Sequence, residues 1–475
     1  MTQRGFAPAA DMAAITVDMR SLRPLVVVIG ATGTGKSKLA LEIATKFNGE
    51  VISADSMQVY KGLNIITNKV TAEERRLVKH HMLDFLDPLS TDYFVTTFRD
   101  RALDIISDLH SQSKLPVIVG GTHYYIESLL WKVLVSPIQE EPLLQDSPCS
   151  CSKVHEVLKP LTTNESTPDS ICEVETSKKR KSRGMPPELE SLSNASLHTF
   201  LKELDPESAE AMHPNDRRKV IRALEVFHTQ GTALSEVIKR QKEEAGGNSL
   251  GGPLRFNHVC LLWVQCQQEV LDRRLDDRVD QMLQNGLVQE LQTFHKEYNM
   301  TREVCTYEEG IFQSIGFKEF HPYLMTKPDL RGEEKGRKLF EQCVENLKIA
   351  TKRYARRQVR WIRNRFLRRP DRPVPPIYGL DATDLEKWND LVSGPAEAVV
   401  KSFLSCEENP LLQPLSQEEP LRQEKRTFFC SECQRLFLGS KVWEDHLRSR
   451  KHKKMVDRSR KKSKSSTLVA CPSVS

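Results

Sequence analysis

One eight-residue stretch constrains the fold of this 475-residue chain more than any other. GATGTGKS, from Gly30 to Ser37, matches the phosphate-binding pattern G-x-x-x-x-G-K-[ST] without a gap. It follows an apolar run, Leu25–Ile29, and opens a helical pattern over Lys36–Phe47. Backbone N–H groups of such a loop surround phosphate oxygens, its lysine adds a point charge, and its hydroxyl ligates Mg²⁺. The stretch therefore predicts a phosphate site formed by Gly30, Ala31, Thr32, Gly33, Thr34, Gly35, Lys36 and Ser37, with Mg²⁺ at Ser37.

The residues around this loop predict an α/β fold, a P-loop parallel sheet flanked by helices. Short apolar strands are expected at Glu50–Ala54 and Pro116–Val119, with a helix at Phe98–Leu109 between them. Such alternation is typical of parallel sheets whose faces are covered by helices. Further along, the patterns predict a strand at Asn257–Val264, an amphipathic helix broken near Gly286, and a helix from about Glu333 to Leu367.

Shifts in composition divide the chain into segments. Residues 136–188 are rich in Ser, Pro, Thr, Glu and Asp, and we expect a disordered insertion there. No window reaches the ~18 uninterrupted apolar residues that a membrane span needs, so no membrane partner is expected. The expected segments are an N-terminal extension (1–23), a first part of the P-loop core (24–135), the insertion (136–188), a helical domain (189–255), a second part of the core with a basic helix (256–376), a linker (377–424), a C2H2-type zinc finger (425–455) and a basic tail (456–475).

The number of cysteines and the clusters of basic residues indicate the cellular compartment of the protein. The eleven cysteines are scattered and odd in number, which favours a reducing intracellular compartment over secretion. Residues 1–23 contain both arginines and aspartates, which leaves a mitochondrial presequence and a disordered extension open. The basic run KKRKSR at 178–183 is either a nuclear signal or a solvated charge cluster. We expect a mitochondrial and cytoplasmic protein, with the nucleus as a further option.

The strand that should carry a second acid in a nucleotide hydrolase lacks one. In LPVIVGGT the apolar run ends in Gly120, Gly121 and Thr122, where a hydrolase would place Asp to organise Mg²⁺ and water. The two glycines suggest close approach of the backbone to a ligand. The acid at a strand end is instead Asp55, at the edge where open α/β sheets bind ligands. Asp55 is either a turn former or a base that deprotonates a nucleophile near the phosphates.

Six stretches, taken together and in order, resemble the tRNA dimethylallyltransferases, also called tRNA isopentenyltransferases, and specifically their eukaryotic members. They span roughly residues 24 to 370 outside the insertion. The stretches are GATGTGKS (30–37), SADSMQVYKGLNIITNK (53–69), VIVGGTHYYIESLLW (117–131), HPNDRRKVIRALEVF (213–227), RLDDRVDQML (274–283) and GIFQSIGFKEF (310–320).

The resemblance implies transfer of a dimethylallyl group from dimethylallyl diphosphate to N6 of adenosine 37 in the tRNA anticodon loop. The target adenine would have to leave its stack to reach the enzyme. By this resemblance Asp55 is the general base, Lys36 and Ser37 with Mg²⁺ neutralise the departing diphosphate, and Thr122 contacts tRNA at the mouth of the channel. The resemblance also implies that Arg278 reaches the diphosphate, whereas its helical spacing alone fits a solvated charge. The matched segments that would grip tRNA are Asp55, Ser56, Met57 and Gln58, and Arg218, Lys219, Val220, Ile221 and Arg222. We expect the protein to act as a monomer.

A basic helix is a second candidate for contact with RNA. The stretch 351–369 holds nine basic residues and no acid. On a helix, Ile362 and Phe366 fall on one face and a basic stripe falls on another, which is either a solvated face or, as the absence of acids favours, a surface for RNA phosphates. Tyr354 and Trp361 could stack on bases or pack into the core. The stripe is formed by Arg353, Arg356, Arg360 and Arg363.

The C-terminal region carries a full ligand set for tetrahedral Zn²⁺. Cys430 and Cys433 are two residues apart, and His446 and His452 follow at spacings of twelve and five residues. The five-residue gap resembles the finger of double-stranded-RNA-binding and spliceosomal proteins. We expect a structural zinc finger that adds RNA affinity rather than chemistry.

Two other classes of function are alternatives to prenyl transfer. A P-loop kinase would turn over ATP, and the missing second acid counts against it. A non-catalytic RNA-binding protein would not need Lys36, Ser37, Asp55 and Arg278 together.

Overall fold

The computed structural model describes residues 23–133, 192–299, 307, 309–407, 412–420 and 427–457. The predicted N-terminal extension, the insertion at 136–188 and nearly all of the basic tail lie outside these residues. The chain divides into two compact units, one made of residues 1–134 and 253–418, the other of residues 135–252 and 419–475. Within the described residues, no helix is both long and apolar enough to cross a membrane.

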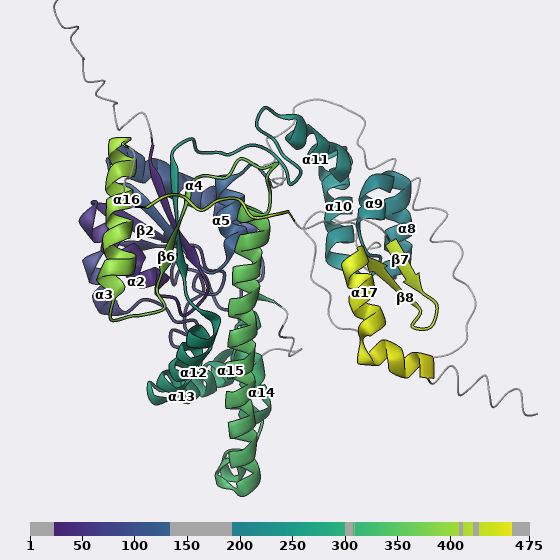
Figure 1. The fold of residues 1–475 in the computed structure, drawn as a ribbon. Coiled ribbons are helices and arrows are strands. Elements are labelled where there is room, and N and C mark those ends of the chain that lie inside the picture. The colour runs from purple at the N-terminus through teal and green to yellow at the C-terminus, as the bar shows by residue number, and fades with distance from the viewer. Residues whose placement is uncertain are drawn as a thin grey trace, which may run out of the picture. The chain divides into compact units, whose positions relative to one another are not determined.

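The first unit is built on one parallel sheet (Figure 1). Its strands in the described residues are β1 (Leu25–Gly30), β2 (Gly49–Ser53), β3 (His80–His81), β4 (Leu115–Val119), β5 (Val259–Gln265) and β6 (Ile377–Asp381). They lie in the order β3-β2-β4-β1-β5-β6, and every pairing is parallel. The carboxyl ends of all strands therefore form one edge, which is the ligand-binding edge of such sheets. The predicted α/β fold is confirmed.

Helices cover both faces of the sheet, because alternate residues of β1 belong to different cores. Val26 and Val28 pack with α2 (Lys36–Lys46) and α16 (Gly394–Ser405). Val27 and Ile29 pack on the opposite face with α4 (Val95–Ser111) and α5 (His123–Leu130). A strand buried on both faces is apolar throughout, which is why this stretch of sequence shows no alternation.

A helical bundle in the same unit carries its own core. α12 (Gln268–Gln284) and α13 (Leu287–Phe294) are separated at Gly286, whose φ of +94° favours glycine, so the predicted break is confirmed. Ion pairs one turn apart join α12 to the antiparallel helix α15 (Glu334–Ile362): Asp272 with Arg356, Asp276 with Lys352 and Asp280 with Lys348. The other helical elements among the described residues of the unit are α3 (Ala72–Leu77), α14 (Phe317–Leu324), η1 (His295–Asn299), η2 (Gly310–Gln313), η3 (Pro328–Gly332), η4 (Arg363–Leu367) and η5 (Asn389–Ser393).

The second unit contains helices and a small ββα module. The helices α8 (Asn194–Leu204), α9 (Pro206–Ala211), α10 (Arg217–Gln230) and α11 (Leu234–Glu243) fall within residues 189–255. Leu197, Phe200 and Leu224 form the centre of their core. The module consists of β7 (Thr427–Cys430), β8 (Arg435–Leu438) and α17 (Ser440–Arg448), and its two strands are antiparallel.

The segment 377–424, predicted as a linker, is largely part of the core, so that prediction was wrong for its first thirty or so residues. β6 pairs with β5, placing Ile377 beside Leu261 at the edge of the sheet. Trp388, Val392 and Val399 are buried on the face that α2 covers. A five-residue strand has too little local pattern to be recognised alone, and its partner β5 lies more than a hundred residues earlier.

Candidate active site

A cavity of about 540 Å³ opens at the carboxyl edge of the sheet. The phosphate loop, the strand-end residue Asp55 and the Gly120–Gly121 turn line it, and α12 contributes Arg274 and Arg278. Residues from four separate stretches of sequence therefore surround one space. The structure brings together Lys36, Ser37, Asp55 and Arg278, as the sequence predicted.

The loop between β1 and α2 holds its lysine in a buried position. Lys36 is 9% exposed, and its Nζ donates a hydrogen bond of 2.6 Å to the carbonyl of Ala31. Burial, and then the charge of Arg278, lowers the pKa of Lys36 to about 7. An anion placed in the loop would supply the missing counter-charge and favour the protonated form. The loop is thus suited to binding an anion.

Arg278 approaches the loop from α12. Its NH1 donates a hydrogen bond of 3.1 Å to the Thr32 hydroxyl. Burial lowers the pKa of Arg278 to about 10, so the side chain stays cationic at neutral pH. Leu275, one turn earlier, packs so closely on Gly33 that a Cβ there would lie 2.7 Å from Leu275 Cδ2. The same helix therefore fixes both the arginine and the curve of the loop.

Asp55 faces these cations from the end of β2. Its Oδ1 accepts the backbone N–H of Met57 at 2.9 Å. Burial raises the pKa of Asp55, and the N–H of Met57 and the charge of Lys36 oppose that rise. A carboxylate with a raised pKa is a stronger base than one in water, which suits removal of a proton from a nucleophile.

Thr122 ties the end of β4 to the end of β2. Its hydroxyl accepts the Ser56 backbone N–H at 3.0 Å and donates to the Ser56 hydroxyl at 3.2 Å. Its own N–H donates to the carbonyl of Ala54 at 3.2 Å. Beside them, the Gln58 amide accepts from the Ser53 hydroxyl and donates to the carbonyls of Thr67 and Asn68. The DSMQ segment is therefore held rigidly at the cavity.

The two glycines before Thr122 line the cavity, and they also make room for neighbouring protein atoms. A Cβ on Gly120 would lie 2.1 Å from the carbonyl oxygen of Ala54. A Cβ on Gly121 would lie 2.4 Å from Nε2 of Gln358 on α15. A side chain at either position would therefore clash with neighbouring atoms of the protein.

Several side chains at the site carried no signal in the sequence. Trp388 packs edge-on against Gly35, so that a Cβ there would meet its ring at 2.7 Å. Arg274 donates to the carbonyls of Ala382 and Thr383, both at 2.6 Å. His123 is buried, and burial together with the charge of Lys36 lowers its pKa to about 3, so it is neutral. Each of these depends on contacts between distant segments, which local periodicity does not reveal.

The basic stripe of α15 and η4 is exposed, and its apolar partners are buried as predicted. Ile362 and Phe366 are fully buried. Trp361 stacks on His123 with 5.8 Å between the ring centroids, so it packs inward and does not present its face for base stacking. Two of the four arginines have acidic neighbours, Asp272 for Arg356 and Glu418 for Arg363. All four, Arg353, Arg356, Arg360 and Arg363, are on the surface.

In α10 the predicted RNA-gripping segment is split between the surface and the core. Arg218 and Lys219 are exposed, and Lys219 pairs with Asp216 at 2.6 Å. Arg222 lies 3.3 Å from Glu225. Val220 is 1% exposed and belongs to the helical core, and Ile221 packs against that core. The side chain of Val220 is therefore not available to RNA, which corrects its assignment.

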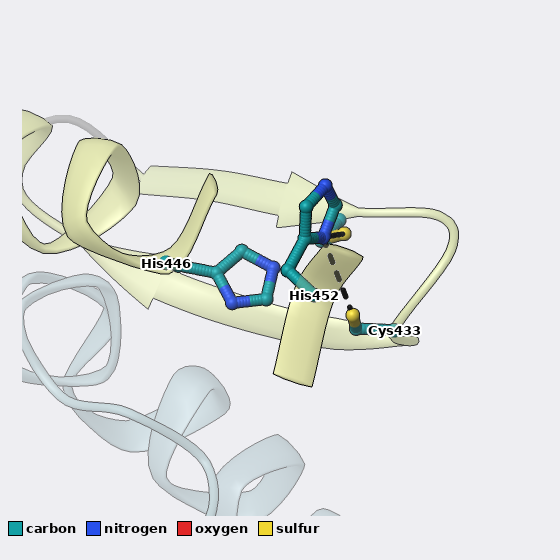
Figure 2. A group of neighbouring side chains, drawn as sticks. Cys433, His446 and His452 are labelled. Carbon is teal, nitrogen blue, oxygen red and sulfur yellow. Dashed lines mark hydrogen bonds between the residues drawn. The ribbon is translucent and has the colours of Figure 1, made fainter. Parts of the chain in front are cut away.

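The ββα module gathers the predicted zinc ligands (Figure 2). The ligand atoms of Cys430, Cys433, His446 and His452 all lie within 4.8 Å of one another. Nδ1 of His452 is 3.4 Å from the Cys433 sulfur, and Nε2 of His446 is buried without a hydrogen-bond partner within the described residues. Tetrahedral Zn²⁺ with bonds of about 2.0–2.3 Å would fit this group and occupy that nitrogen.

Comparison with known proteins agrees with this geometry. Residues 58–365 match the IPP transferase family, residues 24–91 match isopentenyl transferases, and residues 427–453 match double-stranded-RNA-binding zinc fingers. A tRNA dimethylallyltransferase of Mus musculus is 44% identical over 453 residues, covering 94% of this chain and 89% of its own length. Its Homo sapiens counterpart is 45% identical over 433 residues, covering 90% of this chain and 85% of its own length. A solved structure of a eukaryotic dimethylallyltransferase acting on tRNA matches with a TM-score of 0.71 and 31% identity, covering 94% of this chain and 100% of that one.

Proposed function

The chain belongs to the IPP transferase family, among the tRNA dimethylallyltransferases, and from this and the cavity we propose how its residues carry out the transfer. The protein is a prenyltransferase that modifies tRNA. The acceptor is N6 of adenosine 37 and the donor is dimethylallyl diphosphate. The N6–C1 bond forms, the C1–O bond breaks with its electron pair passing to the diphosphate, and the N6 proton passes to Asp55.

This proposal rests on one observation: the carboxylate of Asp55 faces two buried cations, Lys36 and Arg278, across the cavity. Lys36 and Arg278 lie where the leaving diphosphate gains charge, and they cost no reorganisation at that moment because the loop and α12 hold them in place. Asp55 takes the proton from N6 as the new bond forms. The loop N–H groups would complete the anion site.

Ser37 is the residue proposed to hold Mg²⁺. Its side chain is exposed and lines the cavity beside Lys36, so its hydroxyl would be available to hold the metal there. When bound, Mg²⁺ would neutralise charge on the leaving diphosphate. Zinc would be held by Cys430, Cys433, His446 and His452 and would stabilise the finger without entering the reaction. A monomeric state, and a distribution between mitochondria and cytoplasm with a nuclear option, remain proposals from the sequence.

The direct test is label transfer. We would incubate the full chain with radiolabelled dimethylallyl diphosphate and a tRNA that has adenosines at positions 36 to 38. Label is expected in N6-isopentenyladenosine at position 37 after digestion to nucleosides. Consumption of ATP without label in tRNA would instead support the kinase alternative.

The finger should contribute to tRNA affinity and not to the chemical step. We expect Cys433→Ser, which removes one zinc ligand, to raise the KM for tRNA about tenfold while kcat at saturating tRNA is retained, since the lost contacts are to the RNA backbone. Steady-state kinetics with zinc content measured in parallel checks this. Cys406→Ser, at an exposed cysteine outside the zinc cluster, is the control. A large fall in kcat for Cys433→Ser would place the finger in the reaction.

A further inference from the structure

The side chain of Gln358 links two segments at the cavity, the phosphate loop and the turn after β4. It lies on α15, and its side chain is 3% exposed. Its Oε1 accepts the backbone N–H of Thr32 in the phosphate loop at 2.7 Å. Its Nε2 donates to the carbonyl of Gly121 at 2.9 Å. One amide therefore bridges the loop after β1 and the turn after β4.

In the reaction proposed above, these two attachment points belong to the sites of different substrates. Thr32 is part of the loop that holds the diphosphate, and its hydroxyl also accepts from Arg278. Gly121 precedes Thr122, and a Cβ on Gly121 would lie 3.7 Å from Oδ2 of Asp55. The sheet fixes the spacing of β1 and β4, but both segments continue beyond their last paired residues. The amide of Gln358 fixes their spacing there.

The residues around Gln358 leave room for its amide and support these two hydrogen bonds. Gly121 has no side chain, and a Cβ would lie only 2.4 Å from Nε2 of Gln358. Tyr354, one turn earlier on α15, donates a second hydrogen bond of 3.3 Å to the same carbonyl. Burial and the charge of Asp55 raise the pKa of Tyr354, which keeps this donor protonated. The Gly121 carbonyl is therefore held by two donors from one helix.

We propose that Gln358 is a positioning residue that sets the distance between the diphosphate loop and the acceptor side of the cavity. The proposal rests on the transfer reaction proposed above. Bond formation requires C1 of the donor and N6 of the acceptor to be aligned within about 3–3.5 Å, and a shift of about 1 Å can cost about 10²-fold in rate. Gln358 touches no reacting atom and acts through Thr32 and Gly121. The bridge should therefore affect the chemical step more than the binding of either substrate.

An amide is the neutral side chain that suits this place, because it offers a donor and an acceptor side by side. Gln358→Met keeps the length and the packing but loses both hydrogen bonds. Gln358→Glu keeps the acceptor for Thr32 but turns a second oxygen toward the Gly121 carbonyl, which repels it. Once protonated, that carboxyl donates to the carbonyl and restores the original pattern.

The experiment measures kcat, the KM for dimethylallyl diphosphate and the pH profile of label transfer for both variants, with Gln342→Met as a control at an exposed glutamine of the same helix. We expect Gln358→Met to lower kcat about 10²-fold and to change this KM less than about threefold. For Gln358→Glu, the rate relative to wild type should rise as the pH is lowered from 8 to 5.5.

Other outcomes overturn the proposal in different ways. A folded Gln358→Met variant with kcat within about threefold of wild type shows that the bridge does not position the substrates. If that variant does not fold, the Gln358→Glu profile decides, and a ratio to wild type that is flat or rises with pH reduces Gln358 to a stabilising group. Wild-type protein that transfers no label in the same assay refutes the proposed function instead.

Discussion

Replacing Asp55 with asparagine is expected to lower kcat about 10³-fold, within the range that a general base contributes. Asparagine keeps an oxygen that can accept the Met57 N–H, so the local backbone should hold its shape. What the variant loses is the ability to take the N6 proton. Binding of tRNA and of dimethylallyl diphosphate should change little, because neither the loop nor the basic helix is altered.

The pH profile gives Asp55 a signature that a structural role would not. Burial raises its pKa, and the base must be ionised to act, so wild-type kcat should fall as the pH drops through that raised pKa. In Asp55→Asn this acid limb should disappear. The measurement is single-turnover transfer at saturating substrates from pH 5 to pH 8, with Asp104→Asn, at an exposed acid of α4, as the control.

Asp55→Asn should also be at least as stable as wild type. A carboxyl whose pKa is raised by folding favours the folded state when protonated and opposes it when ionised. Stability therefore falls as the pH rises from the unfolded pKa to the raised folded pKa, and asparagine removes that loss. A thermal melt at pH 7 in which the variant unfolds at a lower temperature than wild type, together with reduced tRNA binding, would mean that Asp55 is structural.

The parts of the site that the sequence predicted are those encoded by neighbouring residues. The phosphate loop is specified by glycines, lysine and serine between an apolar strand and a helix, and the structure has that arrangement. Asp55 was found because a strand end in a parallel sheet faces the ligand edge. Arg278 was assigned from family resemblance, since its helical spacing alone also fits a solvated charge.

The parts that were missed depend on contacts across the fold. Gln358 is 326 residues from Thr32, and a glutamine in a basic helix gives no sign that its amide is buried. β6 was assigned to a linker because its strand is short and its pairing with β5 is non-local. The two glycines after β4 pointed correctly to a close approach, but only the fold shows that the neighbours are Ala54 and Gln358.

Replacing Lys36 with methionine is expected to lower kcat/KM for dimethylallyl diphosphate about 10²- to 10³-fold, the scale of losing one preorganised charge at a developing anion. The diphosphate gains charge as the C1–O bond breaks, so part of the loss should appear in kcat and not only in KM. Methionine has nearly the same length and suits a buried site, which limits any change in packing.

The pH dependence of the wild-type KM for dimethylallyl diphosphate tests the role of Lys36 without a substitution. In the free enzyme burial lowers the pKa of Lys36 to about 7, so the ammonium is lost as the pH rises above 7. Diphosphate binding requires that charge, so KM should rise by up to about tenfold per pH unit above 7. The ligand's own ionisation cancels when wild type is divided by Lys36→Met, and this ratio of kcat/KM values should fall with rising pH.

Melting temperatures distinguish a role of Lys36 in anion binding from a general loss of folding in the variant. Because folding lowers the pKa of Lys36 from 10.5 to about 7, its charged form opposes folding fully below about pH 7, and that penalty fades as the pH rises from 7 towards 10.5. Lys36→Met should therefore unfold at a higher temperature than wild type at pH 6 without ligand, whereas wild type should gain more from added diphosphate. Lys46→Met, at the exposed end of the same helix, should show neither effect. Equal diphosphate stabilisation of wild type and Lys36→Met would show that the anion site does not use this lysine.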